Sequence, residues 1–169
     1  MDVPTNVAVT FNPSNATHAA LREAKRYWDE KRGARRMAAR SDIRPGELKR
    51  WLPQILLVDV LPESADFRYR LIGTKLRPYF PSEATGLLFS EALAPFGKAT
   101  TAATLGVYRS IVAQRAPALV SGPGTYYARE SQFFEAMLMP LSDDDSLVTM
   151  IFGAFEFDWA KPTTRLPAG

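Results

Sequence analysis

Residues 147–159 place the strongest constraint on the fold, because this predicted strand is apolar on both of its faces. Successive side chains of a strand point to opposite faces of the sheet. The large apolar side chains therefore divide between one face (Val148, Met150 and Phe152) and the other (Ile151, Phe155 and Phe157). Such a strand in an antiparallel sheet needs apolar cover on both sides. The chain must cover each face with helices, with a second subunit, or with both.

Four further segments are predicted to be strands. Residues 67–72 alternate between apolar side chains and the arginines Arg68 and Arg70, which is typical of a half-buried strand. Turn residues at 62–66 and 142–146 indicate hairpins. The acidic turn 142–146 lacks the glycine and closing glutamate of an EF-hand, so we interpret it as a solvated turn. Together with 147–159, the segments 55–61, 67–72, 118–127 and 133–141 predict a five-stranded antiparallel sheet.

Helical periodicity precedes and interrupts these strands. In residues 16–32, one apolar stripe recurs at helical spacing, and Gly33 is a natural stop. The stripe comprises Ala20, Leu21, Ala24, Tyr27 and Trp28. A short helix is expected after Pro45, short helical pieces within 74–93, and a longer helix over 100–115. The fold class is therefore α+β, with the middle helices on one face of the sheet and the N-terminal helix covering the other.

The chain of 169 residues suits one domain with an extension. We expect a disordered or extended start (1–15), an N-terminal helical segment (16–53), an α/β domain (54–159) and a flexible tail (160–169). Absence of cysteine, of a targeting signal and of long apolar runs predicts a cytoplasmic protein without membrane association. The net charge is +3, yet residues 22–50 carry eleven Lys or Arg against five Asp or Glu. This basic segment is either a solvated helix face or a contact surface.

The order of elements resembles that of a PAS domain. The run Phe67-Arg68-Tyr69-Arg70-Leu71-Ile72-Gly73-Thr74 is similar to the second strand and first helix of PAS domains. An N-terminal run resembles a family of short, stand-alone bacterial PAS-like proteins; it includes Arg26-Tyr27-Trp28, Arg32-Gly33, Arg40-Ser41-Asp42-Ile43, Pro45, Leu52-Pro53 and Asp59-Val60. Ala38 and Arg44 depart from that pattern. The resemblance covers residues 18 to 158 and implies a sensory or regulatory role without catalytic residues.

PAS domains bind ligands between the inner sheet face and the middle helices. The resemblance thus places a ligand pocket among apolar and aromatic side chains with a few polar groups. The ligand-binding candidates are Tyr69, Leu76, Tyr79, Phe80, Leu105, Tyr108, Arg109, Tyr126, Met137 and Met150. Arg109 is proposed to pair with a carboxylate, although a solvent-facing arginine fits the same position. The function expected from these residues is binding of a small molecule, a partner protein or both, with signalling through the N-terminal helix.

Other classes of function fit the sequence less well. His18 is the single histidine and there is no cysteine, so we expect no metal and no cofactor, and a cysteinyl-flavin adduct is excluded. A small α+β cavity enzyme, such as an isomerase or hydrolase, would need a buried acid or base in the pocket. Nucleic-acid binding through residues 22–50 lacks a recognisable reading motif. A homodimer through the N-terminal helix and the outer sheet face, and a signalling protein as partner, are the expected associations.

Overall fold

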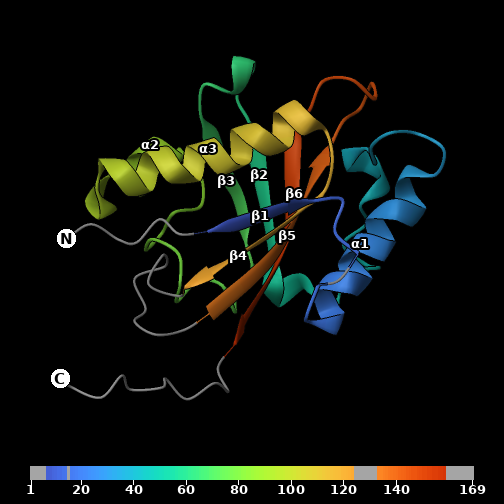
Figure 1. The fold of residues 1–169 in the computed structure, drawn as a ribbon, viewed down its shortest axis with the longest axis horizontal. Coiled ribbons are helices and arrows are strands. Elements are labelled where there is room, and N and C mark those ends of the chain that lie inside the picture. Colours follow the sequence, from blue (N-terminus) through green and yellow to red (C-terminus); the bar gives the residue numbers. More distant parts are fainter. Residues whose placement is uncertain (1–6, 15, 124–132, 159–169) are drawn as a thin grey trace.

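The computed structural model describes residues 7–14, 16–123 and 133–158 of the chain. Within these residues the strands form a six-stranded antiparallel sheet in the order β1-β4-β5-β6-β2-β3 (Figure 1). The strands are β1 (Ala8–Phe11), β2 (Ile55–Val60), β3 (Phe67–Ile72), β4 (Ala118–Pro123), β5 (Phe133–Leu141) and β6 (Met150–Asp158). The predicted α+β class with an antiparallel sheet is confirmed.

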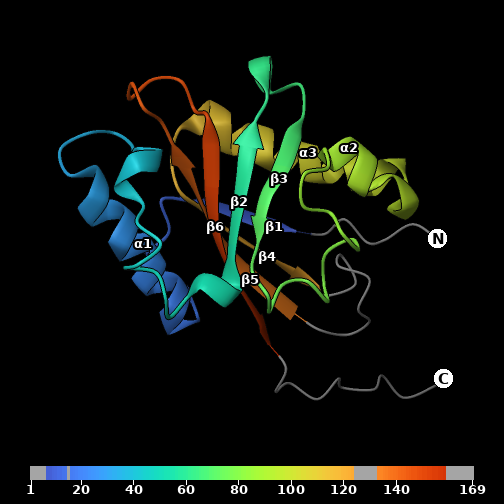
Figure 2. The ribbon, with the colours of Figure 1, turned by 180° about the vertical axis from the view of Figure 1, so that it is seen from behind.

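Helices lie on both sides of this sheet (Figures 1 and 2). The α-helices are α1 (Ala19–Arg32), α2 (Phe89–Ala92) and α3 (Lys98–Gln114), and short 3-10 turns occupy Arg40–Asp42, Leu52–Gln54, Pro62–Ser64 and Ala94–Phe96. Helix α3 and α2 pack on one face, here called the inner face, against β5 and β3 respectively. Helix α1 packs against β5 and β6 from the opposite, outer face. No helix in the described ranges is both long and apolar enough to cross a bilayer.

Strand β6 is covered on both faces, as its composition requires. On its inner face, Phe155 and Phe157 lie opposite Ala136 and Phe134 of β5. On its outer face, Phe152 lies opposite Met139 of β5. All six of these side chains are buried. Burial of a large apolar side chain is worth about 1.5–3 kcal/mol, so both helical layers contribute to the stability of this central strand pair.

Helix α1 begins after His18 and ends at Gly33, whose φ of 57° is readily adopted by glycine. Its stripe Leu21, Ala24, Tyr27 and Trp28 is buried. The predicted N-terminal cover of the outer face is therefore supplied within one chain.

Two local expectations differ from the structure. The sheet has six strands rather than five, because β1 pairs with β4 inside the segment expected to be disordered or extended. Alternation of Val7, Val9 and Phe11 was the signal for it, but only four residues are paired. The helix expected after Pro45 is a set of turns that ends in the 3-10 turn Leu52–Gln54. Parts of the predicted segments 118–127 and 147–159 lie outside the described residues.

Candidate functional site

A small cavity lies on the inner face of the sheet, where the resemblance of the sequence to PAS domains predicted the ligand pocket. Its volume is about 20 Å³. A void of this size holds about one water molecule. The lining residues come from β3, the segment after it, the turn before α3, and α3 itself: Tyr69, Tyr79, Phe80, Pro81, Leu93, Phe96, Thr104 and Tyr108.

Aromatic rings fill the space around this cavity. The Tyr69 ring centroid lies 4.4 Å from that of Phe89 and 5.9 Å from that of Phe80. Tyr79 stacks on Phe157 at 3.8 Å. Such ring pairs each contribute about 0.5–1.5 kcal/mol beyond the burial of their area. The inner layer is thus closely packed, and a ligand larger than water requires side chains to move.

Tyr108 of α3 separates this cavity from a second void. The second void has a volume of about 10 Å³ and lies between α3 and strands β4 to β6. Tyr108 lines both voids, and its own side chain is buried. Tyr108 is therefore the residue that the two linings share.

Polar groups of the cavity are hydroxyls. Thr104 donates a hydrogen bond from Oγ1 to the carbonyl oxygen of Thr100 at 2.9 Å, and both side chains are buried on one face of α3. The Thr100 hydroxyl has no hydrogen-bond partner among the described residues. No Asp, Glu, His, Lys or Arg occurs among the described lining residues. The described lining therefore offers a ligand the hydroxyls of Thr104 and of three tyrosines.

The structure brings together four of the predicted pocket residues, namely Tyr69, Tyr79, Phe80 and Tyr108. Leu76 is buried in the core nearby, and Leu105 is half-buried on α3. Neither lines the cavity. Tyr126 lies outside the described residues.

Three other predicted residues lie away from the cavity. Arg109 is exposed, and its guanidinium donates to the carbonyl oxygens of Ser64 and Ala65 at 2.9 and 2.8 Å. Met137 and Met150 belong to the outer face, since Met137 pairs with Ala154 and Met150 pairs with Leu141. Met137 there lines a cleft beside α1. Alternation of side chains along β5 and β6 explains the error, because either apolar face of these strands fits a pocket equally well.

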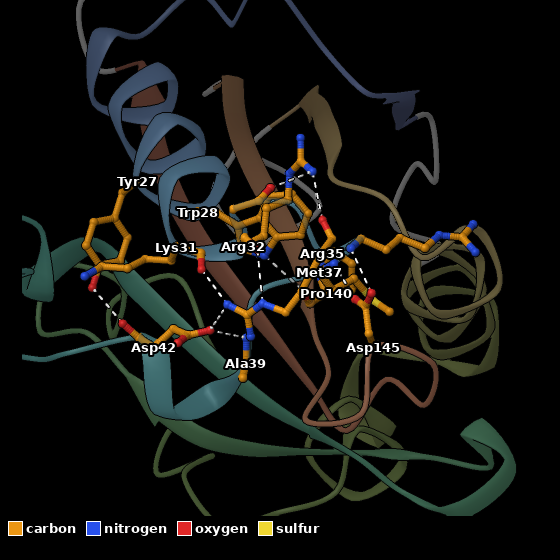
Figure 3. Close-up of polar contacts among 12 residues, drawn as sticks. Tyr27, Trp28, Lys31, Arg32, Arg35, Met37, Ala39, Asp42, Pro140 and Asp145 are labelled. Carbon is orange, nitrogen blue, oxygen red and sulfur yellow. Dashed lines mark hydrogen bonds and ion pairs between the residues drawn. The ribbon is translucent and has the colours of Figure 1, made fainter.

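A second set of contacts joins α1 and the loop after it to the β5–β6 hairpin (Figure 3). The indole Nε1 of Trp28 donates to the carbonyl oxygen of Pro140 at 2.9 Å, and this contact is buried. Ala38 forms a parallel bridge with Leu141, and the amide of Ser142 donates to the carbonyl of Ala38 at 3.0 Å. The loop after α1 therefore follows the end of β5.

Asp145 completes this connection from the hairpin turn. Its carboxylate accepts from the backbone amides of Arg36 at 3.0 Å and Met37 at 2.8 Å. These two bonds stabilise the ionised form and lower the pKa of Asp145. We call this group of contacts the clamp: Trp28 and residues 36–38 on one side, and Pro140, Leu141, Ser142 and Asp145 on the other.

The loop after α1 is also tied back onto α1. The Tyr27 hydroxyl donates to Glu47 Oε2 at 2.8 Å, and Lys31 Nζ lies 2.8 Å from the same oxygen. Burial raises the pKa of Tyr27, while the bond from Lys31 lowers the pKa of Glu47. Farther along, Asp42 accepts from the Ala39 amide at 2.8 Å, which lowers its pKa.

Sequence reasoning missed the clamp. The turn 142–146 was interpreted as solvated, whereas Asp145 binds a loop more than a hundred residues earlier. The run Arg26-Tyr27-Trp28 carried a signal through its resemblance to the N-terminal run of stand-alone PAS-like proteins. The partner of each side chain was not visible, because all the clamp bonds are long-range.

Comparison with known proteins agrees with this geometry. No curated protein matches the chain. A solved structure described as an RNA-binding light-oxygen-voltage receptor is similar in fold, with a TM-score of 0.51 and 15% identity. The match covers 90% of this chain but only 38% of that receptor. A family model described as a PAS domain matches residues 16–156. The chain belongs to the PAS domain family.

Proposed function

We propose that this PAS domain is a sensor that binds a small molecule at the inner cavity and reports binding through α1 and the clamp. One observation carries the proposal: strands β5 and β6 have the cavity-side aromatic layer on one face and α1 on the other. PAS domains serve in sensing and regulation, and the hydroxyl-lined apolar cavity supports a ligand that is mainly apolar with one or two polar groups.

Entry of such a ligand is proposed to move Tyr108. The voids beside Tyr108 are together too small for an organic molecule, so we interpret the structure described here as the ligand-free, closed state. A ligand that rotates this ring joins both voids and contacts the hydroxyl of Thr104. Ligand binding then selects an expanded packing of the inner layer.

Strand β5 offers the route from the cavity side to α1. Phe134, Ala136 and Leu138 line the void beside Tyr108, and the intervening Met137 lies beside α1. The carbonyl of Pro140, two residues after Leu138, accepts the Trp28 indole bond. Because packed layers transmit small displacements rather than absorb them, movement of β5 changes the clamp. The signal would be a change in the contacts between residues 28–38 and the β5–β6 hairpin.

Native mass spectrometry of the purified protein tests ligand binding. We expect an adduct with a small molecule that is lost in Thr104→Leu, where added volume fills the cavity. Thr101→Leu is the matched control, because Thr101 is on the same helix but does not line the cavity. An adduct that persists equally in both variants, or no adduct and no thermal shift with any apolar probe, would contradict the proposed site.

Hydrogen–deuterium exchange tests transmission separately. The amides of Arg36, Met37 and Ser142 are bonded across the clamp, so their exchange should change when ligand binds. Exchange that changes only in α2 and α3 would show binding without transmission to α1.

Association with other chains stays a prediction. We expect a homodimer and a signalling partner in the cytoplasm. The apolar stripe of α1 already packs on its own sheet, so a dimer at this place must use the outer side of α1 or exchange the helix. Light scattering on the full chain and on a variant lacking residues 1–33 tests this. An unchanged, well-behaved monomer in both would contradict a dimer through α1.

A further inference from the structure

A basic furrow runs along one side of α1, away from the inner cavity. It consists of two clefts that share Lys25 and Asp29. One cleft, of about 440 Å³, lies between α1 and the α3–β4 connection. The other, of about 290 Å³, lies between α1 and the connection from β1. Among the described lining residues the charges are strongly unequal: Asp29 is the one carboxylate, against Arg22, Lys25, Arg26, Arg32, Arg36 and Arg115.

Helical spacing places this charge on one flank of α1. Residues 22, 25, 26, 29 and 32 recur at intervals of three and four, which aligns them along one side of a helix. The two glutamates of α1, Glu23 and Glu30, fall outside this row and do not line the furrow. Five of the eleven basic residues of 22–50 thus line a concave surface in which Asp29 is the one described carboxylate.

Several of these cations are held in position. Asp29 binds Lys25 at 2.7 Å and Arg32 at 3.1 Å, so one carboxylate is shared by two cations. Arg22 donates to the carbonyl of Ala16 at 2.6 Å. Arg115 donates to the carbonyl of Ser146 at 2.7 Å. A guanidinium has five N–H donors, so each arginine bonded to a backbone carbonyl keeps donors for an anion. Basic side chains that are already held in one position lose less conformational entropy when an anion binds.

The chemistry of the lining distinguishes between polyanions. Single-stranded nucleic acids are bound by exposed aromatic rings on which bases stack. The aromatic residue of the described lining is Trp28, which is 2% exposed and bonded to Pro140. Its ring is further covered by Arg32 at 5.8 Å. Carboxylates need no stacking surface and pair well with arginine.

We propose that the basic furrow is a docking site for an extended, acidic segment of a partner protein. Charge complementarity selects the partner, and two neighbouring clefts beside the same helix fit an extended chain of carboxylates. Arg36 belongs to the clamp and, with Trp28, lines the furrow, so an occupant would lie against the element proposed to move on sensing. The furrow does not share residues with the inner cavity, and its occupancy stands or falls independently of the small-molecule site.

Fluorescence anisotropy with a labelled peptide of alternating glutamate and serine tests the proposal, at low and moderate salt. The double variant Arg26→Glu/Arg36→Glu should weaken binding by at least about tenfold, since two attractive pairs become repulsive. The matched control, Lys49→Glu/Arg50→Glu, changes net charge equally at exposed positions of the same basic segment outside the furrow. It should weaken binding by less than about threefold.

Because Arg36 belongs to the clamp through its backbone amide, the single variant Arg26→Glu is measured alongside, and circular dichroism confirms that each variant is folded. Absence of peptide binding by the unmodified chain at low salt would overturn the proposal. Equal losses in the two double variants would also overturn it, since they would show attraction by net charge alone. Tighter binding of a single-stranded RNA oligonucleotide than of the peptide, lost in the same furrow variants, would assign the furrow to nucleic acid instead.

Discussion

Replacing Trp28 by phenylalanine tests the buried contact that anchors α1 to β5. The substitution keeps an apolar ring but removes the indole N–H, which donates to the carbonyl of Pro140 at 2.9 Å in a buried position. Leaving a buried polar group without its partner costs about 1–3 kcal/mol. The smaller ring leaves a void in a site that is 2% exposed, which adds roughly 1 kcal/mol. We therefore expect the free energy of unfolding to fall by about 2–4 kcal/mol.

Urea denaturation followed by circular dichroism measures this loss, and the melting temperature should fall by roughly 4–16 °C. Trp51→Phe is the control, because Trp51 is half-buried and its ring centroid lies 6.3 Å from that of Tyr27 in an edge-to-face arrangement. It should cost less than about 1 kcal/mol, as expected for a partly exposed site. Equal losses in the two variants, or a loss below about 1 kcal/mol for Trp28→Phe, would refute a special role for the bond to Pro140.

The remaining predictions concern pH, backbone packing and a surface arginine. The pKa values of Asp42 and Asp145 are lowered by backbone amides, so the stability that the two ionised carboxylates provide is present above about pH 4 and is lost as the pH falls further. The midpoint of urea denaturation should therefore decrease below that pH, and it should decrease less in Asp145→Asn. Gly73→Ala should cost about 2 kcal/mol or more, because a Cβ there would overlap the backbone carbonyl of Pro53; an unchanged thermal melt would contradict this contact. Arg109→Ala should lower the melting temperature by less than about 3 °C and leave ligand binding unchanged, since this side chain is exposed and bonds only loop carbonyls; lost ligand binding would return Arg109 to the site.

Much of the fold could be predicted because its signals are local. Alternation and apolar runs located β2, β3 and β5, and helical spacing located α1 and α3 to within a few residues. Strand β1 was missed because a four-residue strand depends on pairing with β4 rather than on its own composition. The turns after Pro45 replaced a predicted helix, since local propensity is weak compared with tertiary contacts.

The candidate site was predicted in part. Tyr69, Tyr79, Phe80 and Tyr108 meet at one cavity because the PAS-like order of elements brings them together. The small volume of that cavity depends on how rings from distant segments pack, as where Tyr79 stacks on Phe157. Such packing cannot be read from spacing along the chain.

By itself the sequence determined that β6 must be buried on both faces, that α1 carries an apolar stripe to cover one of them, and that positive charge gathers in residues 22–50. Only the tertiary structure decided which face of β5 and β6 looks toward α3 and which toward α1. Alternation separates the side chains of a strand into two sets, but two apolar sets are indistinguishable without their neighbours. Met137 therefore lies beside α1, and Asp145 anchors the loop after α1, through contacts that exist only once distant segments have packed together.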